Sequence, residues 1–223
     1  MEPSDSWYFI FLSWHSLLPI SGLLATGGCD RRLYLYKPAD ENGSGWSMDN
    51  YPYMVHNGSV EDIEFSPVDP NLIASCSVDG TVKFIDLRGA YKNECASHID
   101  VTKVDVNVLS WCSKSPNLVA TGSDDGSVKV WDIRYLQKAR PVTDIQFHTA
   151  PITSIQFEPF EDSVLTVSSA DNRITIWDFS VESDKKMKNT SDVPDQLMFI
   201  HQGLEDVKEV KYILKLRGVL INI

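Results

Sequence analysis

Sets of histidine, serine or threonine, aspartate and tryptophan recur along this chain of 223 residues. The sets are His56, Ser75 and Asp79; His98, Thr121, Asp125 and Trp131; and His148, Asp171 and Trp177. A hydroxyl, an imidazole and a carboxylate are the groups of a nucleophilic triad, in which the imidazole activates the hydroxyl and the carboxylate orients the imidazole. An active site needs one such set, and this chain repeats it. The repetition therefore favours a structural role over a catalytic one.

The aspartates of these sets lie in turns between two strand-like runs. Around Asp125, residues 117–134 read NLVATGSDDGSVKVWDIR. Val128 and Val130 are separated by the polar Lys129, and this alternation of apolar and polar residues is the pattern of a half-buried strand. Asp-Gly between two such runs is a strong hairpin signal, because both residues tolerate positive φ. The stretch therefore predicts a β-hairpin.

This hairpin recurs at a fixed period. Asp79, Asp125 and Asp171 are each 46 residues apart, in segments that read NLIASCSVDGTVKFIDLR, NLVATGSDDGSVKVWDIR and SVLTVSSADNRITIWD. A more divergent copy, GLLATGGCDRRLYLYK, places Asp30 49 residues before Asp79. Periods of about 40 to 45 residues with a Trp-Asp signature indicate β-propeller blades of four strands each. We therefore predict an all-β fold.

Over most of its length the chain resembles the WD-repeat propeller family. The segments HNGSVEDIEFSP, GSDDGSVKVWDIR and LMFIHQG resemble in particular the glutamate-rich WD-repeat proteins of ribosome assembly. The histone-binding WD-repeat proteins are a related branch. The resemblance implies that the recurring side chains form one buried hydrogen-bond chain in each blade, which is stable only when it is complete. The second set has Ile85 in place of tryptophan, and the last has Val167 where a hydroxyl is expected.

The repeat period also indicates the number of blades. Dividing the length of the chain by 46 residues gives fewer than five blades, whereas the propellers that the chain resembles usually close with seven. We therefore predict an incomplete propeller of about four blades plus the start of a fifth. The expected segments are 1–55 (an irregular first blade), 56–97 (second), 98–147 (third), 148–179 (core of the fourth), 180–195 (a mobile charged loop) and 196–223 (the truncated start of a further blade).

The third blade differs in the spacing of its histidine. His56 and His148 each precede the first strand of their blade by four residues, whereas His98 precedes Val106 by eight. Insertions in repeat proteins mark loops. We therefore expect a four-residue insertion on one face of the third blade.

Both ends of the chain depart from the repeat. Residues 7–24 are rich in apolar side chains, but acidic residues precede them and polar residues interrupt them, which disfavours a signal peptide or membrane span. Trp14, 16 residues before Asp30, is expected on the innermost strand of the first blade. After Tyr212 the sequence ILKLRGVLINI matches no repeat, and we expect a truncated protein or a misread gene end.

Composition limits the class of partner. The net charge of −11, from 31 acidic and 20 basic residues, disfavours direct binding to nucleic acid and favours a basic protein. The four cysteines show neither CxxC spacing nor a Cys-His cluster, so we predict reduced thiols and no metal. The sequence contains no phosphate-binding loop or zinc-protease motif, so we predict no cofactor.

A function without an active site has to lie on the surface. Propellers of the family that the chain resembles bind peptides and basic segments through loops at one end, near the residue before the turn aspartate and the start of the first strand. The corresponding positions are Glu61, Asp62, Asn107, Asp124, Thr153 and Lys208. Three of them are acidic, as a basic ligand requires. The alternative is that these are ordinary solvated loop residues.

Three hypotheses for function follow. The resemblance implies a non-enzymatic scaffold of the nucleus and nucleolus that chaperones a basic ribosomal protein, the third of the large-subunit series. The alternative is a histone-binding subunit of chromatin complexes. The run His201, Gln202 and Gly203 favours the first, because the histone-binding relatives typically have a second glycine after this histidine. The third hypothesis is an enzyme. The acidic N-terminal extension and last blades of the first family have no counterpart in the chain, so binding by this chain alone stays open.

Overall fold

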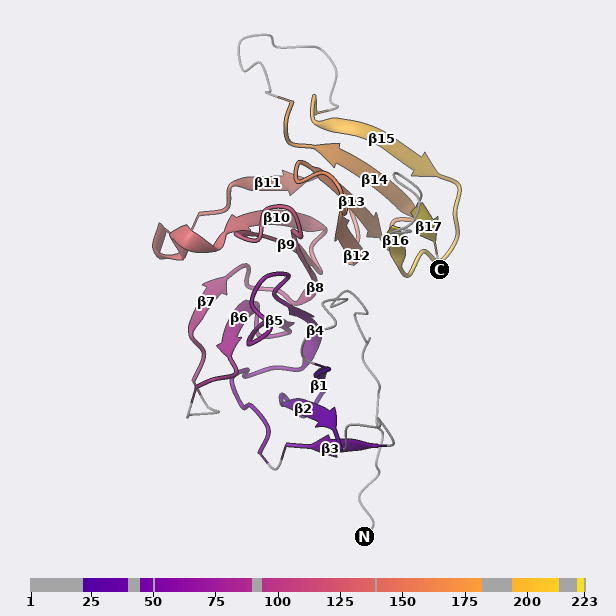
Figure 1. Ribbon diagram of the computed structural model, residues 1–223. Helices are drawn as coiled ribbons and strands as arrows, with labels where there is room; N and C mark the ends of the chain where they lie inside the picture. The colour runs from indigo at the N-terminus through magenta and orange to yellow at the C-terminus, as the bar shows by residue number, and fades with distance from the viewer. Residues whose placement is uncertain are drawn as a thin grey trace. The chain divides into compact units, whose positions relative to one another are not determined.

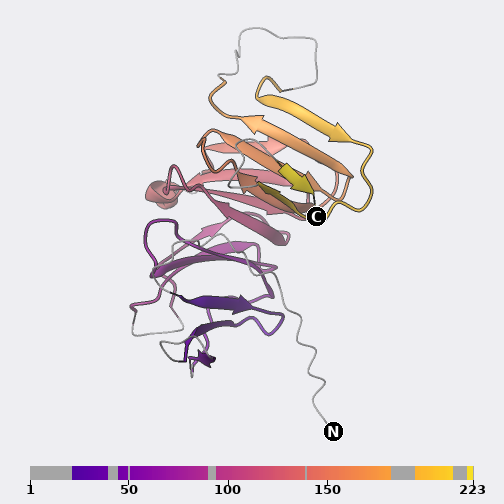
Figure 2. The same cartoon turned by 45° about the vertical axis from the view of Figure 1, so that its right-hand side comes forward.

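The computed structural model describes residues 22–39, 45–49, 51–89, 94–138, 140–181, 194–212 and 220–222. In these ranges every element is a β-strand except one short 3-10 helix, η1 (Ile133–Lys138). The strands form antiparallel sheets in which neighbours along the chain pair with each other (Figures 1 and 2). This arrangement confirms the predicted fold class, an incomplete propeller of about four blades. None of the described residues forms a helix with the length and hydropathy needed to cross a bilayer.

Two sheets belong to the first half of the chain. The three-stranded sheet consists of β1 (Leu24–Gly27), β2 (Leu33–Pro38) and β3 (Trp46–Met48). The four-stranded sheet after it consists of β4 (Val60–Phe65), β5 (Leu72–Ser77), β6 (Thr81–Asp86) and β7 (Ser97–Asp100).

The second half of the chain holds two further four-stranded sheets and a strand pair. The third sheet consists of β8 (Val106–Trp111), β9 (Leu118–Ser123), β10 (Ser127–Asp132) and β11 (Thr143–Gln146). The fourth sheet consists of β12 (Ile152–Phe157), β13 (Val164–Ser169), β14 (Arg173–Asp178) and β15 (Leu197–Gln202). The pair consists of β16 (Val210–Tyr212) and β17 (Leu220–Asn222).

The hairpin predicted around Asp125 is confirmed by the pairing of β9 with β10. Trp131 lies directly opposite Val119 in this ladder. The amide of Gly126 donates to the carbonyl oxygen of Ser123 at 3.2 Å and closes the turn. The glycine has a φ of 80°, which other residues adopt only with strain.

Replacing this turn glycine should destabilise the protein. A Cβ at Gly126 would lie 2.5 Å from the carbonyl oxygen of His148. We expect Gly126→Ala to lower the free energy of unfolding by more than the roughly 1 to 2 kcal/mol that a left-handed conformation alone costs. Gly203→Ala is the control, because Gly203 has a φ of 93° and nothing within 4 Å of an added Cβ. Equal losses in urea denaturation would contradict the close approach at Gly126.

The chain forms two compact units, residues 1–106 and 107–223. In the first unit, the buried core lies between the first and second sheets. Its members are Leu33, Leu35, Tyr53, Val55, Val60, Ile73 and Ile85. In the second unit, the core joins the third and fourth sheets. Its members are Cys112, Ala120, Val128, Val130, Ile145, Ile152, Ile155, Phe157, Leu165, Val167 and Trp177. The four cysteines are all free thiols.

The sheets do not follow the expected repeat boundaries. The outer strand β7 ends at Asp100 and pairs with β6, so the second sheet extends beyond residue 97. Likewise β15 pairs with β14 and completes the fourth sheet, whereas residues 196–223 were expected to start a further blade. The physical reason is that each outer strand bonds to the free edge of the sheet that precedes it. Trp14 and most of the expected loop, residues 182–193, lie outside the described residues.

Candidate protein-binding site

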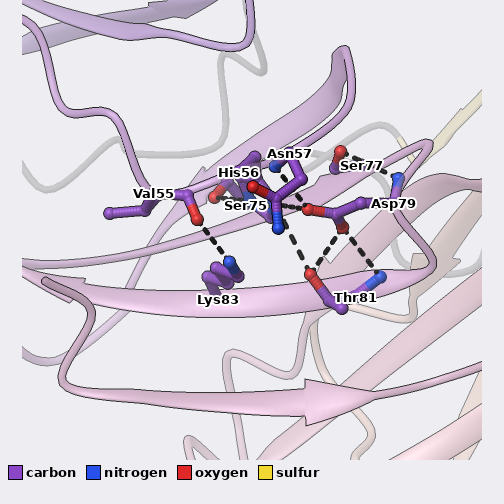
Figure 3. A network of polar contacts seen from close by, with 8 residues as sticks. All are labelled: Val55, His56, Asn57, Ser75, Ser77, Asp79, Thr81 and Lys83. Carbon is purple, nitrogen blue, oxygen red and sulfur yellow. Dashed lines mark hydrogen bonds and ion pairs between the residues drawn. The ribbon is translucent and has the colours of Figure 1, made fainter. Parts of the chain in front are cut away.

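The second sheet contains a continuous hydrogen-bond network around its turn (Figure 3). His56 lies between two partners: Nε2 is 2.8 Å from Ser75 Oγ, and Nδ1 is 3.0 Å from Asp79 Oδ2. Asp79 also accepts the amide of Asn57 at 2.9 Å and the hydroxyl of Thr81 at 2.6 Å. The network thus joins the loop before β4, the middle of β5 and the turn before β6.

The partners of His56 fix its protonation. A carboxylate only accepts hydrogen bonds, so Nδ1 carries the proton donated to Asp79, and Nε2 accepts the hydroxyl proton of Ser75. Burial lowers the pKa of His56, and the neighbouring carboxylate opposes this only in part. Burial raises the pKa of Asp79, but hydrogen bonds from Thr81 and Asn57 bring it below its usual value. The pair is therefore a neutral imidazole bound to a carboxylate.

The fourth sheet builds the same network with a hydroxyl that the sequence analysis missed. His148 Nδ1 donates to Asp171 at 3.0 Å, and Nε2 accepts from the hydroxyl of Thr175 at 2.9 Å. The indole N–H of Trp177 donates to the same hydroxyl at 2.9 Å. Thr175 lies directly opposite Val167 in the ladder of β13 and β14. The hydroxyl expected at Val167 is thus supplied by the neighbouring strand.

The predicted place of His98 is wrong. His98 is exposed on β7, in the second sheet, and so it is not part of the third network. The residue 46 positions after His56 and 46 before His148 is Thr102. Its carbonyl oxygen approaches Gly80, as expected for this register position. The third repeat therefore has no insertion before its first strand, and a threonine replaces the histidine.

The third sheet consequently has a shorter network. The indole N–H of Trp131 donates to Thr121 Oγ1 at 3.1 Å, and this hydroxyl points to a backbone carbonyl of β10 at 3.4 Å. Asp125 is exposed in the turn. The hydroxyls of Ser123 and Ser127 are buried, and neither has a hydrogen-bond partner among the described residues. The third repeat thus lacks the histidine of the other two networks, and the two serine hydroxyls beside its turn are without hydrogen-bond partners in the described part of the chain.

The two networks with histidine predict a pH dependence of stability. Burial lowers the pKa of His56 and of His148 in the folded state. The unfolded chain, with an ordinary pKa of about 6.5, then binds protons first, so stability is full above that pH and falls as the pH decreases through the folded pKa values. Urea unfolding between pH 8 and 5 measures this loss. His148→Gln should reduce this loss, because it removes one of the two buried imidazoles. An unchanged pH dependence in that variant would contradict the assignment.

Two of the candidate binding residues lie at bulges in the innermost strands. The ladder register shifts across Glu61 in β4 and across Thr153 in β12. A bulge interrupts pairing and changes the direction of a side chain. Asp62 follows the first bulge, and its Oδ1 accepts the amide of Ile63 at 2.8 Å. Thr153 Oγ1 lies 3.0 Å from Ser168 Oγ. Both carboxylates of the first bulge are half-buried at the strand end.

Asn107 and Asp124 are brought together in the second unit. The side-chain amide of Asn107 donates to the carbonyl oxygen of Ile152 at 3.3 Å and lies 3.5 Å from Asp124 Oδ1. Asp124 is exposed in the turn between β9 and β10. The side-chain amide of Asn107 thus lies beside one carboxylate oxygen of Asp124 at the end of the third sheet.

Lys208, the remaining candidate, has a partner of its own. Its Nζ lies 2.5 Å from Asp206 Oδ1, and both side chains are exposed. The amide of Asp206 donates to Asn172 Oδ1 at 3.1 Å, which ties this loop to the turn of the fourth sheet. Glu61 and Asp62 belong to the first unit, and the other four candidates belong to the second. The described residues contain no group of three or more metal-ligating side chains.

Four-stranded sheets that recur at a 46-residue period, with His-Asp turns and buried Trp-hydroxyl contacts, define a WD-repeat β-propeller protein. Comparison with known families agrees. The family described as the nucleolar protein 10-like N-terminal domain, a β-propeller, matches residues 47–208, and the chain belongs to this family.

Three similar proteins share shorter segments with the chain. Ribosome assembly protein rrb1 of Schizosaccharomyces pombe is 40% identical over 92 residues, 41% of this chain and 18% of that protein. Glutamate-rich WD repeat-containing protein 1 of Dictyostelium discoideum is 41% identical over 69 residues, 31% of this chain and 14% of that protein. Protein HEAT STRESS TOLERANT DWD 1 of Arabidopsis thaliana is 44% identical over 68 residues, 30% and 14% of the two chains. The chain thus covers less than a fifth of each relative.

Proposed function

We propose that this protein is a non-enzymatic scaffold of ribosome biogenesis that binds and chaperones a basic large-subunit ribosomal protein. The observation that carries this proposal is the similarity to proteins named for ribosome assembly, rrb1 among them. A further relative, ribosome biogenesis protein YTM1 of Debaryomyces hansenii, is 34% identical over 71 residues. The nucleolar name of the family supports a nuclear and nucleolar location.

Charge supports a basic partner. The chain carries a net charge of −11, which attracts a positively charged protein and repels a nucleic-acid backbone. Three of the acidic residues are candidates for binding. Glu61 and Asp62 lie at a bulged strand end in the first unit, and Asp124 lies in an exposed turn in the second unit. We propose that these carboxylates receive lysine and arginine side chains of the partner, with Asn107, Thr153 and Lys208 as further contacts.

Reversing two of these charges should slow association. We expect Glu61→Lys with Asp62→Lys to lower the association rate constant for a basic ribosomal protein by about 3- to 10-fold at low salt, because partly exposed charges act mainly by steering. The dissociation rate constant should change less. Stopped-flow fluorescence or surface plasmon resonance at several salt concentrations measures both, and the effect should shrink as salt screens the charges.

The control has the same change of net charge at another place. Asp100→Lys with Asp144→Lys reverses two exposed carboxylates on the outer strands β7 and β11. If this control slows association as much as the reversal at Glu61 and Asp62, only the net charge matters. That result would remove the assignment of the first bulge as a binding surface.

A further inference from the structure

The turn between β8 and β9 has a serine where its counterpart in the second sheet has an aspartate. Asp69 lies in the turn between β4 and β5, and the residue 46 positions later is Ser115. Each is followed by proline, Pro70 in the second sheet and Pro116 in the third. A neutral hydroxyl therefore occupies a position where the preceding repeat has a carboxylate.

In the second sheet the carboxylate of Asp69 pairs with an arginine. Arg88 donates from Nε and Nη2 to Asp86, both at 2.8 Å, and Nη2 also donates to Asp69 Oδ2 at 3.1 Å. The guanidinium thus bridges the end of β6 and the preceding turn. Two carboxylates share one arginine.

The third sheet repeats the arginine but not the second carboxylate. Arg134, 46 residues after Arg88, donates to Asp132 from Nε at 2.9 Å and from Nη2 at 2.6 Å. At the register position of Asp69 stands Ser115. Among the described residues, Arg134 therefore has one anionic partner, whereas Arg88 has two.

In the unmodified protein, the side chain of Ser115 forms a hydrogen bond to the neighbouring fourth sheet. Its hydroxyl donates to Asp162 Oδ2, in the turn between β12 and β13, at 2.6 Å. The residue is half-buried, and its carbonyl oxygen accepts the amide of Leu118 at 2.8 Å, which fixes the turn. The hydroxyl thus links the third and fourth sheets within the second unit.

We propose that Ser115 is a phosphorylation site for a proline-directed protein kinase, and that its phosphate pairs with Arg134 as Asp69 pairs with Arg88. In this step Ser115 Oγ attacks the γ-phosphorus of a nucleoside triphosphate, the Oγ–P bond forms, and the bond to the nucleoside diphosphate breaks. The hydroxyl proton passes to the base of the kinase, and the diphosphate leaves. This modification site is independent of the proposed ribosomal partner.

Phosphorylation exchanges one interaction for another. The phosphate carries a charge of about −1.5 to −2 at pH 7 and repels the carboxylate of Asp162, so the link between the third and fourth sheets is lost. The guanidinium of Arg134 offers charge-assisted hydrogen bonds to the new oxygens. The modification therefore loosens a contact between sheets and strengthens one within a sheet.

The chain contains its own control. The other Ser-Pro sequence is Ser66-Pro67. Ser66 is only 3% exposed, and its Oγ accepts the amides of Asp69 at 3.2 Å and Val68 at 3.4 Å. A kinase that acts on the folded protein should therefore reach Ser115 and not Ser66.

The first experiment incubates the 223-residue chain with a purified cyclin-dependent kinase and Mg-ATP and locates the phosphate by mass spectrometry. Peptides that span each Ser-Pro sequence serve as controls for the kinase. We expect phosphate on Ser115 alone in the folded chain, none in Ser115→Ala, and phosphate on both peptides. If Ser66 is phosphorylated as fast as Ser115 in the chain, or Ser115 is not phosphorylated, the proposal is wrong.

The second experiment tests the pairing with Arg134. The titration of the phosphate at Ser115 is followed by phosphorus NMR, where a free phosphoserine titrates near pH 6. Removing a paired cation raises the pH at which the phosphate titrates. We therefore expect this midpoint to be about 0.5 to 1 pH unit higher in Arg134→Gln than in Arg140→Gln. The second variant is the control, because it removes an exposed arginine elsewhere in the unit. Equal midpoints in the two variants would overturn the pairing.

Discussion

Replacing Trp131 by alanine is expected to lower the free energy of unfolding by about 3 to 5 kcal/mol, the usual range for a buried aromatic side chain. Trp131 is 4% exposed on β10. The change removes its packing and also leaves the hydroxyl of Thr121 without the indole N–H that it accepts at 3.1 Å. Urea denaturation followed by circular dichroism measures the loss.

Two controls separate burial from the change of side chain. Trp46→Ala deletes the same indole at a position on β3 that is 57% exposed. Lys129→Ala shortens a half-buried, charged side chain two residues before Trp131 on the same strand. Both should cost less than about 1 kcal/mol, as surface substitutions do. Losses equal to that of Trp131→Ala would refute the strand assignment.

The second large effect is expected at Thr175. Its hydroxyl serves both His148 Nε2 and the indole N–H of Trp177, each at 2.9 Å. Thr175→Val keeps the shape of the side chain but leaves two buried polar groups without a partner. At about 1 to 3 kcal/mol for each such group, we expect a loss of about 2 to 6 kcal/mol.

Thr175→Ser tests the cause of that loss, because it keeps the hydroxyl and removes only a methyl group. It should retain most of the stability, whereas Thr143→Val, on the outer strand β11, should be close to neutral. If the valine and serine variants at Thr175 lose the same stability in thermal or urea unfolding, packing and not hydrogen bonding holds this position.

The recurring turns could be predicted from the sequence because they depend on local chemistry. Asp125 and Gly126 form a turn between two alternating runs, and the same pattern returns after 46 residues. The error at His98 came from choosing the nearest histidine instead of the register position. A constant spacing from His56 would have led to Thr102, because the loop before each first strand has a fixed length.

Other features depend on contacts that a single strand does not encode. The hydroxyl of the fourth network comes from Thr175, which lies opposite Val167 across the ladder. Only the pairing register shows that the two positions are neighbours. The candidate binding residues are harder still: Glu61, Asn107 and Thr153 follow the 46-residue period, but their side chains differ in type. The bulge at Glu61 and the contact of Asn107 with Asp124 become visible only in three dimensions.

The most direct test of the proposed function compares two basic partners on this chain. A purified basic ribosomal protein, the third of the large-subunit series, and a histone tail peptide are titrated against it by isothermal calorimetry at increasing salt. We predict tighter binding of the ribosomal protein, with an affinity that falls as salt rises and weakens when Glu61 and Asp62 are both changed to lysine. A histone tail that binds at least as tightly, with neither affinity changed by that double substitution, would contradict the proposal.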